Sequence, residues 1–546
     1  AALLALLAQG EAEAAAEQLQ RLFTVLHQQG RLEEAYSLLL VPVVLHSALV
    51  AQFRQFPLEQ QMIMLQAGLE ACDVGDWLSR ALCDEACQAL FLVVKGEGLY
   101  NARQLEAAVE AYQEALELYQ QLARTQPEVY EPDVARTLNN LGNALYQLRR
   151  YEAAVEVFQQ ALAIYQRLAQ QQPQVYEPYL ADTLNDLGNA LQGLRRYEAA
   201  VEVFQQALAI YQRLAQQQPQ VYEVKLAGTL TNLGTALRDL HIYEESVAIL
   251  EESLAIYRRF VRLRPEIYEP HLAITLNNLG TVFRRMHRYD ESVRVLEEAL
   301  AIRRRLALHQ PEIYTPGLAG TLLNLGATYD EMGRSVEALK IQEEALELYR
   351  YLTLESEVHA PNLALILNNM GLVLDRLNRY EEAVNVYEEA LAIRRRLMEH
   401  RPEQYGQDVA QTLTNLASTL GKLGRKEEAN RMYEEAVEIR RWLAQQQPEA
   451  YEPYLALTLA SLGAALLELG QSDESLKANE EALAIYHRLA SRQPEAYVPN
   501  LALVIDNLGN TLQSLLRLDE AIMAHQEALA IRRRLAQQQP DVYEPD

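Results

Sequence analysis

The chain of 546 residues repeats itself every 46 residues from about residue 92 to its C-terminus. A glycine, preceded by leucine in most copies, marks ten copies at this spacing, with one step of 45 residues and one alanine, Ala417, in the glycine position. The glycines are Gly96, Gly142, Gly188, Gly234, Gly280, Gly326, Gly371, Gly463 and Gly509. A repeat of this length stacks one supersecondary unit on the next and creates a long surface. We therefore expect a binding surface and not a single catalytic pocket.

Each copy contains two runs of apolar residues at helical spacing, joined by a short turn such as Arg195-Arg196. One copy reads Leu184, Leu187, Ala190, Leu191 and Leu194, then Tyr197, Ala200, Val201, Phe204, Leu208 and Tyr211. Pro178 predicts the first residue of the first helix, because a missing N–H costs nothing there. Pro219 predicts the end of the second helix. Each copy is therefore predicted to be two antiparallel helices.

Small and aromatic residues predict how these helices pack. Gly188 and Ala200 indicate a close approach of the two helices, since larger side chains would hold them apart. A tyrosine such as Tyr176 recurs just before each second proline and is predicted to fill the gap between successive hairpins. His359 replaces it in the 45-residue copy, so we expect a local distortion there.

The residues Leu138, Leu141-Gly142, Leu145, Ala154, Phe158 and Ala161 resemble the pattern of the tetratricopeptide repeat (TPR). The longer period is similar to the extended repeats of kinesin light chain and of bacterial TPR sensor and scaffold arrays. The resemblance implies an all-α, right-handed solenoid of about ten helix-turn-helix units over residues 92–546. It also implies that a protein or peptide binds the concave face, which the first helix of each unit lines.

Residues 1–91 are predicted to be helical but out of phase with the repeat. They are expected to form an N-terminal cap over the first hydrophobic face, or a linker to an upstream signalling domain. The chain begins without Met and ends at Val542–Asp546 in the start of an eleventh first helix. We therefore expect it to be an excised part of a larger multidomain protein.

Composition restricts the kinds of partner that the chain is expected to bind. The net charge of −26 and the pI near 4.9 argue against nucleic acid and against anionic membrane surfaces. The longest apolar run, Leu38–Ala51, is too short to span a bilayer and is interrupted by Pro42. Three cysteines are no disulfide framework and favour a reducing compartment, so a cytoplasmic location is expected.

Asparagines recur on the first helices, on either side of the leucine–glycine step. One row, predicted to face the ligand, is Asn139, Asn143, Asn185, Asn189, Asn277, Asn368 and Asn510. A second row, for which a structural role is preferred, is Asn140, Asn232, Asn278, Asn324, Asn369, Asn415 and Asn507. Each amide offers a donor and an acceptor, so a ladder of them can hold the backbone of an extended peptide. The alternative is that some of these amides only bond to the neighbouring hairpin, or merely repeat by descent.

Other positions of the same face change along the chain. Leu323, Ala327 and Leu372 predict an apolar stretch that would form pockets for side chains. Arg238, Arg284 and Arg285 are candidates for binding an acidic part of the ligand. The alternative for these arginines is ordinary solvated charge at a turn.

No motif indicates catalysis, a cofactor or a metal. Cys83 and Cys87 share a helix face, but no second pair of metal ligands follows, so buried structural thiols are the expected reading. The predicted function is a peptide- or protein-binding scaffold or sensor, part of a larger signalling or defence protein, and not an enzyme. The alternative is an array that associates with itself and brings attached effector domains together.

Overall fold

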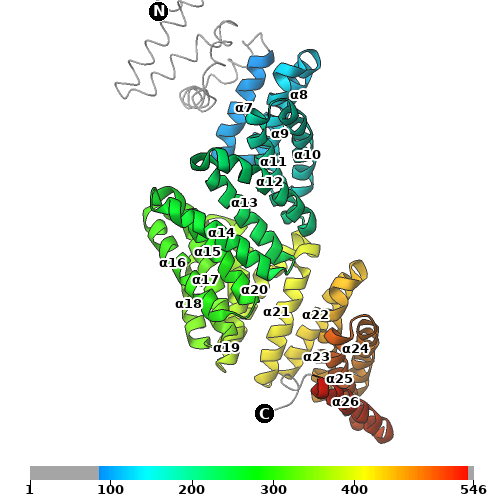
Figure 1. Cartoon of the computed structure of the whole chain (residues 1–546). Coiled ribbons are helices and arrows are strands. Elements are labelled where there is room, and N and C mark those ends of the chain that lie inside the picture. The colour runs from blue at the N-terminus through cyan, green and yellow to red at the C-terminus, as the bar shows by residue number, and fades with distance from the viewer. Residues whose placement is uncertain (1–84, 539–546) are drawn as a thin grey trace, which may run out of the picture. The chain divides into compact units, whose positions relative to one another are not determined.

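The computed structural model describes residues 85–538, which form ten helical hairpins (Figure 1). The first, or A, helices are α7 (Glu85–Asn101), α9 (Pro127–Gln147), α11 (Pro173–Gly193), α13 (Pro219–Asp239), α15 (Pro265–Arg285), α17 (Pro311–Glu331), α19 (Ala360–Arg376), α21 (Pro402–Lys422), α23 (Pro448–Glu468) and α25 (Pro494–Ser514). The second, or B, helices are α8 (Leu105–Thr125), α10 (Tyr151–Gln171), α12 (Tyr197–Gln217), α14 (Tyr243–Val261), α16 (Tyr289–His309), α18 (Ser335–Glu355), α20 (Tyr380–His400), α22 (Lys426–Gln446), α24 (Ser472–Arg492) and α26 (Leu518–Gln538). Residues 85–538 contain no strand, and the all-α prediction is confirmed.

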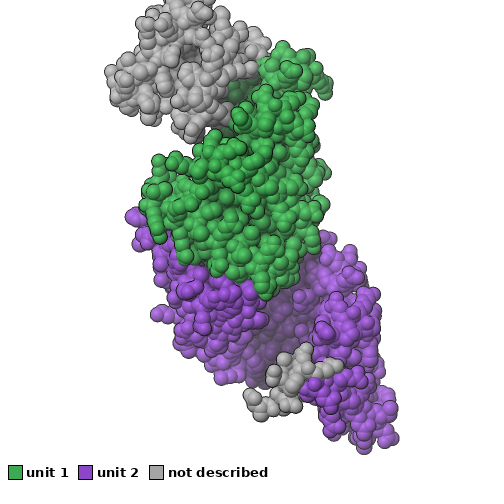
Figure 2. Space-filling model, in the orientation of Figure 1, with its two compact units in different colours: residues 1–282 green, residues 283–546 purple. Residues whose placement is uncertain are grey.

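The chain divides into two compact units, residues 1–282 and residues 283–546, with the boundary inside α15 (Figure 2). Each unit is a stack of hairpins, in which the helices from α7 to α14 and those from α16 to α26 each pack on the next one in sequence. The first hairpin begins at Glu85, before the predicted boundary at residue 92. The predicted cap or linker, the apolar run Leu38–Ala51 and the predicted eleventh first helix lie outside the described residues.

The recurring glycine sets the distance between the two helices of a hairpin. A β-carbon at Gly142 would lie only 2.5 Å from Cε1 of Phe158, and one at Gly234 would lie 2.6 Å from Cγ of Leu250. Gly188 faces Phe204 in the same way, and both phenylalanine rings are fully buried. The predicted close approach of the helices is therefore confirmed, and a side chain of the B helix fills the space, an aromatic ring beside Gly142 and Gly188 and a leucine beside Gly234.

The turn between the two helices needs one residue in the left-handed region. In the second hairpin that residue is Arg149, with φ of 58°, and in the third it is Arg195, also at 58°. The Arg196 N–H then donates to the Leu191 carbonyl at 2.9 Å, which closes the C-terminus of α11. The turn predicted at Arg195-Arg196 is confirmed.

The predicted helix start at Pro178 is wrong. α11 begins at Pro173, and Pro178 lies inside it as the sixth residue. Pro219 likewise begins α13 and does not merely end α12, because Gln218 alone separates the two helices. Where a linker carries two prolines, as before α11, the earlier one takes the first helical position, where no N–H is needed. The later proline leaves one carbonyl of the first turn without a helical donor.

The 45-residue copy is distorted, as predicted. Glu357 stands where neighbouring copies have the helix-starting proline, and Glu357–His359 form a 3₁₀ turn. Ser356 caps this turn by accepting a hydrogen bond from the Val358 N–H at 3.4 Å. As a result α19 starts only at Ala360 and is shorter than its neighbours.

The linker tyrosines fill the gaps between hairpins. Tyr130 lies 6.4 Å from Tyr119 between ring centres, and Tyr268 meets Phe260 edge-on at 5.3 Å. Tyr405 is 8% exposed. These contacts confirm the packing role predicted for this position.

Two hairpins share a stretch of identical sequence. Residues Leu148–Glu177 and Leu194–Glu223 are the same, so α10 and α12 have one sequence. Both helices bury the same side of that sequence, with Phe158 and Phe204 each fully buried. The fold therefore uses one packing surface twice.

Within residues 85–538, only α23 is long and apolar enough to cross a membrane by length and composition, with a mean hydropathy of 1.2. Of its most apolar stretch, 44% is buried inside the protein. Leu455, Leu459 and Leu462 belong to the hydrophobic core of unit 2, where α23 packs between α22 and α24. The apolar character of α23 is therefore used in packing the hairpins.

Candidate functional site

Asparagines link successive A helices. Asn140 of α9 donates a hydrogen bond to Glu97 Oε1 of α7 at 3.0 Å. Equivalent bonds join Asn232 to Asn185, Asn278 to Thr235 and, in unit 2, Asn415 to Asn368. The structural role predicted for the second row is confirmed at these positions. We call the side chains that form these bonds in unit 1, together with Asn139, Asn143 and Asp186, the polar row.

Asp186 is the charged centre of the polar row. Asn139 and Asn143 of α9 each donate to its Oδ2 at 3.1 Å. Burial raises the pKa of Asp186 to about 6, although the two amide hydrogen bonds lower it. The two asparagines therefore hold a carboxylate of the neighbouring helix, and each amide keeps a second N–H for another acceptor.

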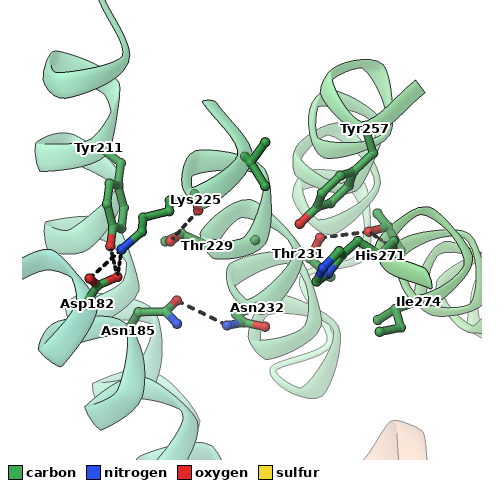
Figure 3. A pocket seen from close by; sticks show the side chains of 13 residues that line it. Asp182, Asn185, Tyr211, Lys225, Thr229, Thr231, Asn232, Tyr257, His271 and Ile274 are labelled. Atoms are coloured by element: carbon green, nitrogen blue, oxygen red, sulfur yellow. Dashed lines mark hydrogen bonds and ion pairs between the residues drawn. The ribbon is translucent and has the colours of Figure 1, made fainter. Parts of the chain in front are cut away.

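A pocket of about 380 Å³ opens beside the polar row, between α11, α13 and α15 of unit 1 (Figure 3). Tyr211 of α12 and Tyr257 of α14 reach it from the B helices. A β-carbon at Gly228 would lie 3.6 Å from the Tyr257 hydroxyl, whereas neighbouring copies carry Asp182 and Ile274 at this position. The missing side chain at Gly228 therefore keeps the pocket open.

One wall of the pocket is a compensated ion pair. The Lys225 ammonium lies 2.6 Å from Asp182 Oδ2 and 2.8 Å from Oδ1, and the Tyr211 hydroxyl donates to the same carboxylate (Figure 3). Burial, followed by the negative charge of Asp182, raises the pKa of Tyr211, so the phenol stays protonated. This wall carries no net charge.

The opposite wall is aromatic. His271 of α15 stacks on Tyr257 of α14, with ring centres 5.6 Å apart and planes at 8°. Burial lowers the pKa of His271, so its imidazole is neutral at pH 7, and burial raises the pKa of Tyr257. The Tyr257 hydroxyl therefore remains a donor at the edge of the pocket.

Several polar atoms of the pocket have no partner among the described residues. They are the Tyr257 hydroxyl, the ring nitrogens of His271, one N–H of the Lys225 ammonium, the Asn185 amide N–H₂ and the Asn232 carbonyl oxygen. They include both donors and acceptors, and the charges beside them balance. The pocket is suited to an uncharged polar group such as an amide.

In residues 85–538, no three His, Cys, Asp or Glu side chains are placed to hold a metal ion.

Comparison with known proteins agrees with the hairpin geometry. Two sequence profiles, both described as Tetratricopeptide repeat, together match more than half of the chain. One matches residues 95–167, 225–305, 271–351 and 318–396, and the other matches 180–218, 409–441, 455–494 and 501–541. The chain belongs to the tetratricopeptide repeat family. TPR arrays are in general scaffolds for protein–protein interaction and not catalysts, and this chain has that architecture.

Solved structures resemble parts of this TPR chain. BtubC (BKLC) from P. vanneervenii is 23% identical, with a TM-score of 0.37, over 47% of this chain and 94% of its own. The apo form of RapI is 17% identical, with a TM-score of 0.40, over 57% and 99%. A Podosopora anserina putative kinesin light chain with nearly identical TPR-like repeats is 20% identical, with a TM-score of 0.32, over 41% and 97%. A search of curated proteins finds no match.

The ligand-facing asparagines predicted for the TPR array lie in different surroundings. In unit 1, Asn139, Asn143 and Asn185 belong to the polar row, and Asn189 and Asn277 are half-buried on α11 and α15. In unit 2, Asn368 is 5% exposed and accepts hydrogen bonds from Thr412 and Asn415. Asn510 is exposed on α25. Their role in ligand binding stays a prediction.

The other predicted ligand-binding positions also lie in different surroundings. Leu323, Ala327 and Leu372 are half-buried on α17 and α19, and Leu323 packs against the core of unit 2. Arg238 donates to Asp239 Oδ1 at 2.7 and 2.8 Å and to the Thr281 hydroxyl at 3.2 Å. Arg284 pairs with Glu331, and Arg285 is exposed. Arg238 and Arg284 thus have partners within the chain, and ligand binding at all these positions stays a prediction.

Sequence reasoning missed Asp182, Tyr211, Lys225, Tyr257 and His271. A signal existed: between the constant residues at the start of each A helix, two positions vary from copy to copy. Tyr179 and Asp182 become Lys225 and Gly228, and then His271 and Ile274. Positions that vary within an otherwise copied stretch are candidates for ligand contact. Cys83 lies outside the described residues, and Cys87 lies on α7.

Proposed function

We propose that unit 1 binds an extended peptide or protein segment along the polar row, with the pocket at Gly228 receiving one side chain. The observation that carries this proposal is an open pocket whose charges balance and whose remaining donors and acceptors lack partners. A ligand that covers these polar atoms must pair with them, because a polar group buried without a partner is costly, and this requirement gives specificity.

The occupant best matched to the pocket is an amide side chain, as in Asn or Gln. Its oxygen would accept from the Tyr257 hydroxyl or the Lys225 ammonium, and its N–H₂ would donate to the Asn232 carbonyl oxygen. A charged side chain is disfavoured, because Lys225 and Asp182 already neutralise each other at 2.6 Å. The second N–H groups of Asn139 and Asn143 are available for backbone carbonyls of the same segment.

The test is an array of random-sequence peptides probed with the protein and with Gly228→Leu. Leucine at residue 228 fills the pocket without disturbing the helix, because the nearest atom to its β-carbon lies at an ordinary contact distance of 3.6 Å. Among the peptides that the protein binds, we expect those rich in Asn or Gln to lose about tenfold in affinity.

The matched control is Gly421→Leu on α21, where a β-carbon meets nothing within 4 Å. It should bind as the unchanged protein does. A protein that binds no peptide would refute the proposed function, and equal binding by Gly228→Leu would place recognition elsewhere.

We also propose that the chain acts as the sensor or scaffold region of a larger signalling or defence protein in the cytoplasm. The row of hydrogen bonds between successive A helices of unit 1 supports a role in recognition. Imaging of a fluorescently tagged full-length protein in its own cells tests the location, and a secreted or envelope-bound signal would contradict it.

A second candidate function is self-association, which one surface favours. On α26, Leu518, Ile522 and Leu529 are 55%, 55% and 47% exposed. Sedimentation at increasing protein concentration should show a larger species that Ile522→Lys abolishes. A constant monomer mass would remove this alternative.

A further inference from the structure

At one equivalent position near the C-terminal end of its buried face, each B helix carries a tyrosine or an arginine. Tyr211 and Tyr257 occupy this position in unit 1, and the arginines in unit 2 are Arg303, Arg394, Arg440 and Arg532. A guanidinium keeps its charge in the folded protein, and a charge removed from water needs a compensating partner. What surrounds each arginine therefore decides whether it is structural or available to a ligand.

Three of these guanidiniums have further side-chain partners in the chain, a carboxylate for Arg532 and Arg394 and neutral groups for Arg440. Arg532 Nη2 lies 3.0 Å from Asp506 Oδ2. Asp408 of α21 lies next to Arg394 and its negative charge acts on that guanidinium. Arg440, only 1% exposed, donates to Gln411 Oε1 at 3.1 Å and lies 5.7 Å from the centre of the Tyr454 ring. These arginines are accounted for by contacts within unit 2.

Arg303 of α16 differs. Its Nη1 donates to the Thr321 hydroxyl at 2.6 Å and to the Gly317 carbonyl, both on α17. Among the described residues no carboxylate lies within ion-pair distance of it, and its hydrogen bonds there all come from Nη1, which leaves Nε and Nη2 without a partner. Burial lowers the pKa of Arg303 to about 10, which the nearby Tyr349 offsets only in part, so the group is still charged at pH 7.

Two glycines of α17 leave this guanidinium uncovered. A β-carbon at Gly317 would lie 3.4 Å from both Cζ and Nε of Arg303, so any side chain there would cover that edge. The equivalent residues are Asp408 over Arg394 and Tyr454 over Arg440. A β-carbon at Gly320 would lie 3.9 Å from the Tyr349 hydroxyl, which stays protonated because burial raises its pKa to about 12. Beside α17, one edge of the Arg303 guanidinium and the neutral Tyr349 hydroxyl are thus both left uncovered by side chains of that helix.

We propose that Arg303, opened by Gly317 and Gly320, is a carboxylate-binding site for a peptide ligand in unit 2. The proposal rests on the proposed peptide-binding function and adds the chemistry of a second contact. The Nε and Nη2 edge presents two parallel N–H donors, which match the two oxygens of a carboxylate. One guanidinium balances the single charge of a carboxylate but not the nearly double charge of a phosphate, and the chain as a whole is strongly acidic.

The first test observes the guanidinium directly. Arginine side-chain NMR signals are recorded during titration with N-acetylglycine, and Arg303 is assigned by the signal lost in Arg303→Gln. We expect the Arg303 signal to shift with N-acetylglycine and not with its uncharged amide. In Gly317→Asp the shift should vanish, because the new carboxylate occupies the site as Asp408 does beside Arg394. Gly421→Asp makes the same change in open space and should leave the shift intact. No shift, or an equal shift with the amide, overturns the proposal.

The second test uses peptides that the random-sequence array captures. Their acidic residues are changed to amides in one set, and their C-terminal carboxylate is changed to the carboxamide in another. Loss of about tenfold in affinity in one set, matched by Arg303→Gln, supports the proposal and identifies which carboxylate binds. Affinity unchanged in both sets and in Arg303→Gln overturns it. If no peptide binds while N-acetylglycine still shifts Arg303, the peptide-binding function has failed and the carboxylate site stands.

Discussion

Gly96 and Gly98 lie two residues apart in α7 and should respond oppositely to the same substitution. A β-carbon at Gly96 would lie 2.6 Å from Cε1 of Tyr112, whereas one at Gly98 would meet nothing within 4 Å. Tyr112 is 2% exposed, so its ring cannot give way without unpacking the first hairpin. The pair separates the packing role of the recurring glycine from the intrinsic effect of glycine on a helix.

The magnitudes follow from two opposed effects. Alanine in place of glycine stabilises a helix by up to about 1 kcal/mol. Forcing an extra carbon into a packed core costs about 1–3 kcal/mol. Gly98→Ala should therefore stabilise α7 by up to about 1 kcal/mol, and Gly96→Ala should destabilise it by up to about 2 kcal/mol. Hydrogen exchange of peptides from α7 and α8 measures this, since repeat arrays open locally.

The Tyr112→Ala variant tests whether the ring causes the loss of stability in Gly96→Ala. In Tyr112→Ala the ring is gone, so Gly96→Ala should become stabilising, as Gly98→Ala is. Equal stabilisation by the two single variants would refute the packing argument. So would an unchanged cost of Gly96→Ala in the background without the ring.

Substitutions at three further positions test other features. Asp186→Asn should remove a pH dependence: burial raises the folded-state pKa to about 6 from an ordinary 3.8, so this group's contribution to stability is lost as pH rises from about 4 to about 6. Urea unfolding across that range should show the variant more stable at pH 7 by on the order of 2 kcal/mol, and a variant with the same pH slope as the parent would contradict this. Arg440→Tyr introduces the residue that other copies carry, and it should leave thermal stability unchanged or raise it. Arg440→Ala should lower the stability by about 3 kcal/mol, because it leaves a cavity. Equal losses of stability in the two variants would rule out the argument that the buried charge is costly. Leu516→Gly should stabilise the last turn by about 1 kcal/mol in the same assay, because Leu516 has a left-handed backbone with φ of 60° and its side chain is 81% exposed. A loss of stability would mean that this leucine is packed in solution.

The fold was readable from the sequence because each copy repeats the same two helical stripes. The glycine that recurs at one position of the copies predicted the close helix pairs that Gly142 and Phe158 form. The helix start was misplaced because Pro173 and Pro178 both satisfy the rules for the first turn of a helix. Only the packing of the linker decides that the earlier one begins α11.

The pocket and the Arg303 site were not readable in the same way. In the sequence, Tyr211 and Tyr257 look like core residues, and Arg303 looks like one of a run of charges near the end of a helix. Whether such a side chain reaches a ligand depends on the size of the residue opposite, such as Gly228 or Gly317, on an A helix. That pairing is a contact between helices, and the period alone does not reveal it.

The identical sequences of α10 and α12 have a consequence for how the chain folds. Residues 148–177 and 194–223 offer the same docking surface to any neighbour, so nothing within these segments distinguishes the correct seat from the wrong one. During folding, either helix can dock where the other belongs and leave one repeat looped out, a trap that native-like contacts stabilise. The residues that correct the error lie just beyond the duplicated stretch. There Lys225 and Gly228 replace Tyr179 and Asp182, so the positions that open the pocket also distinguish the order of the repeats.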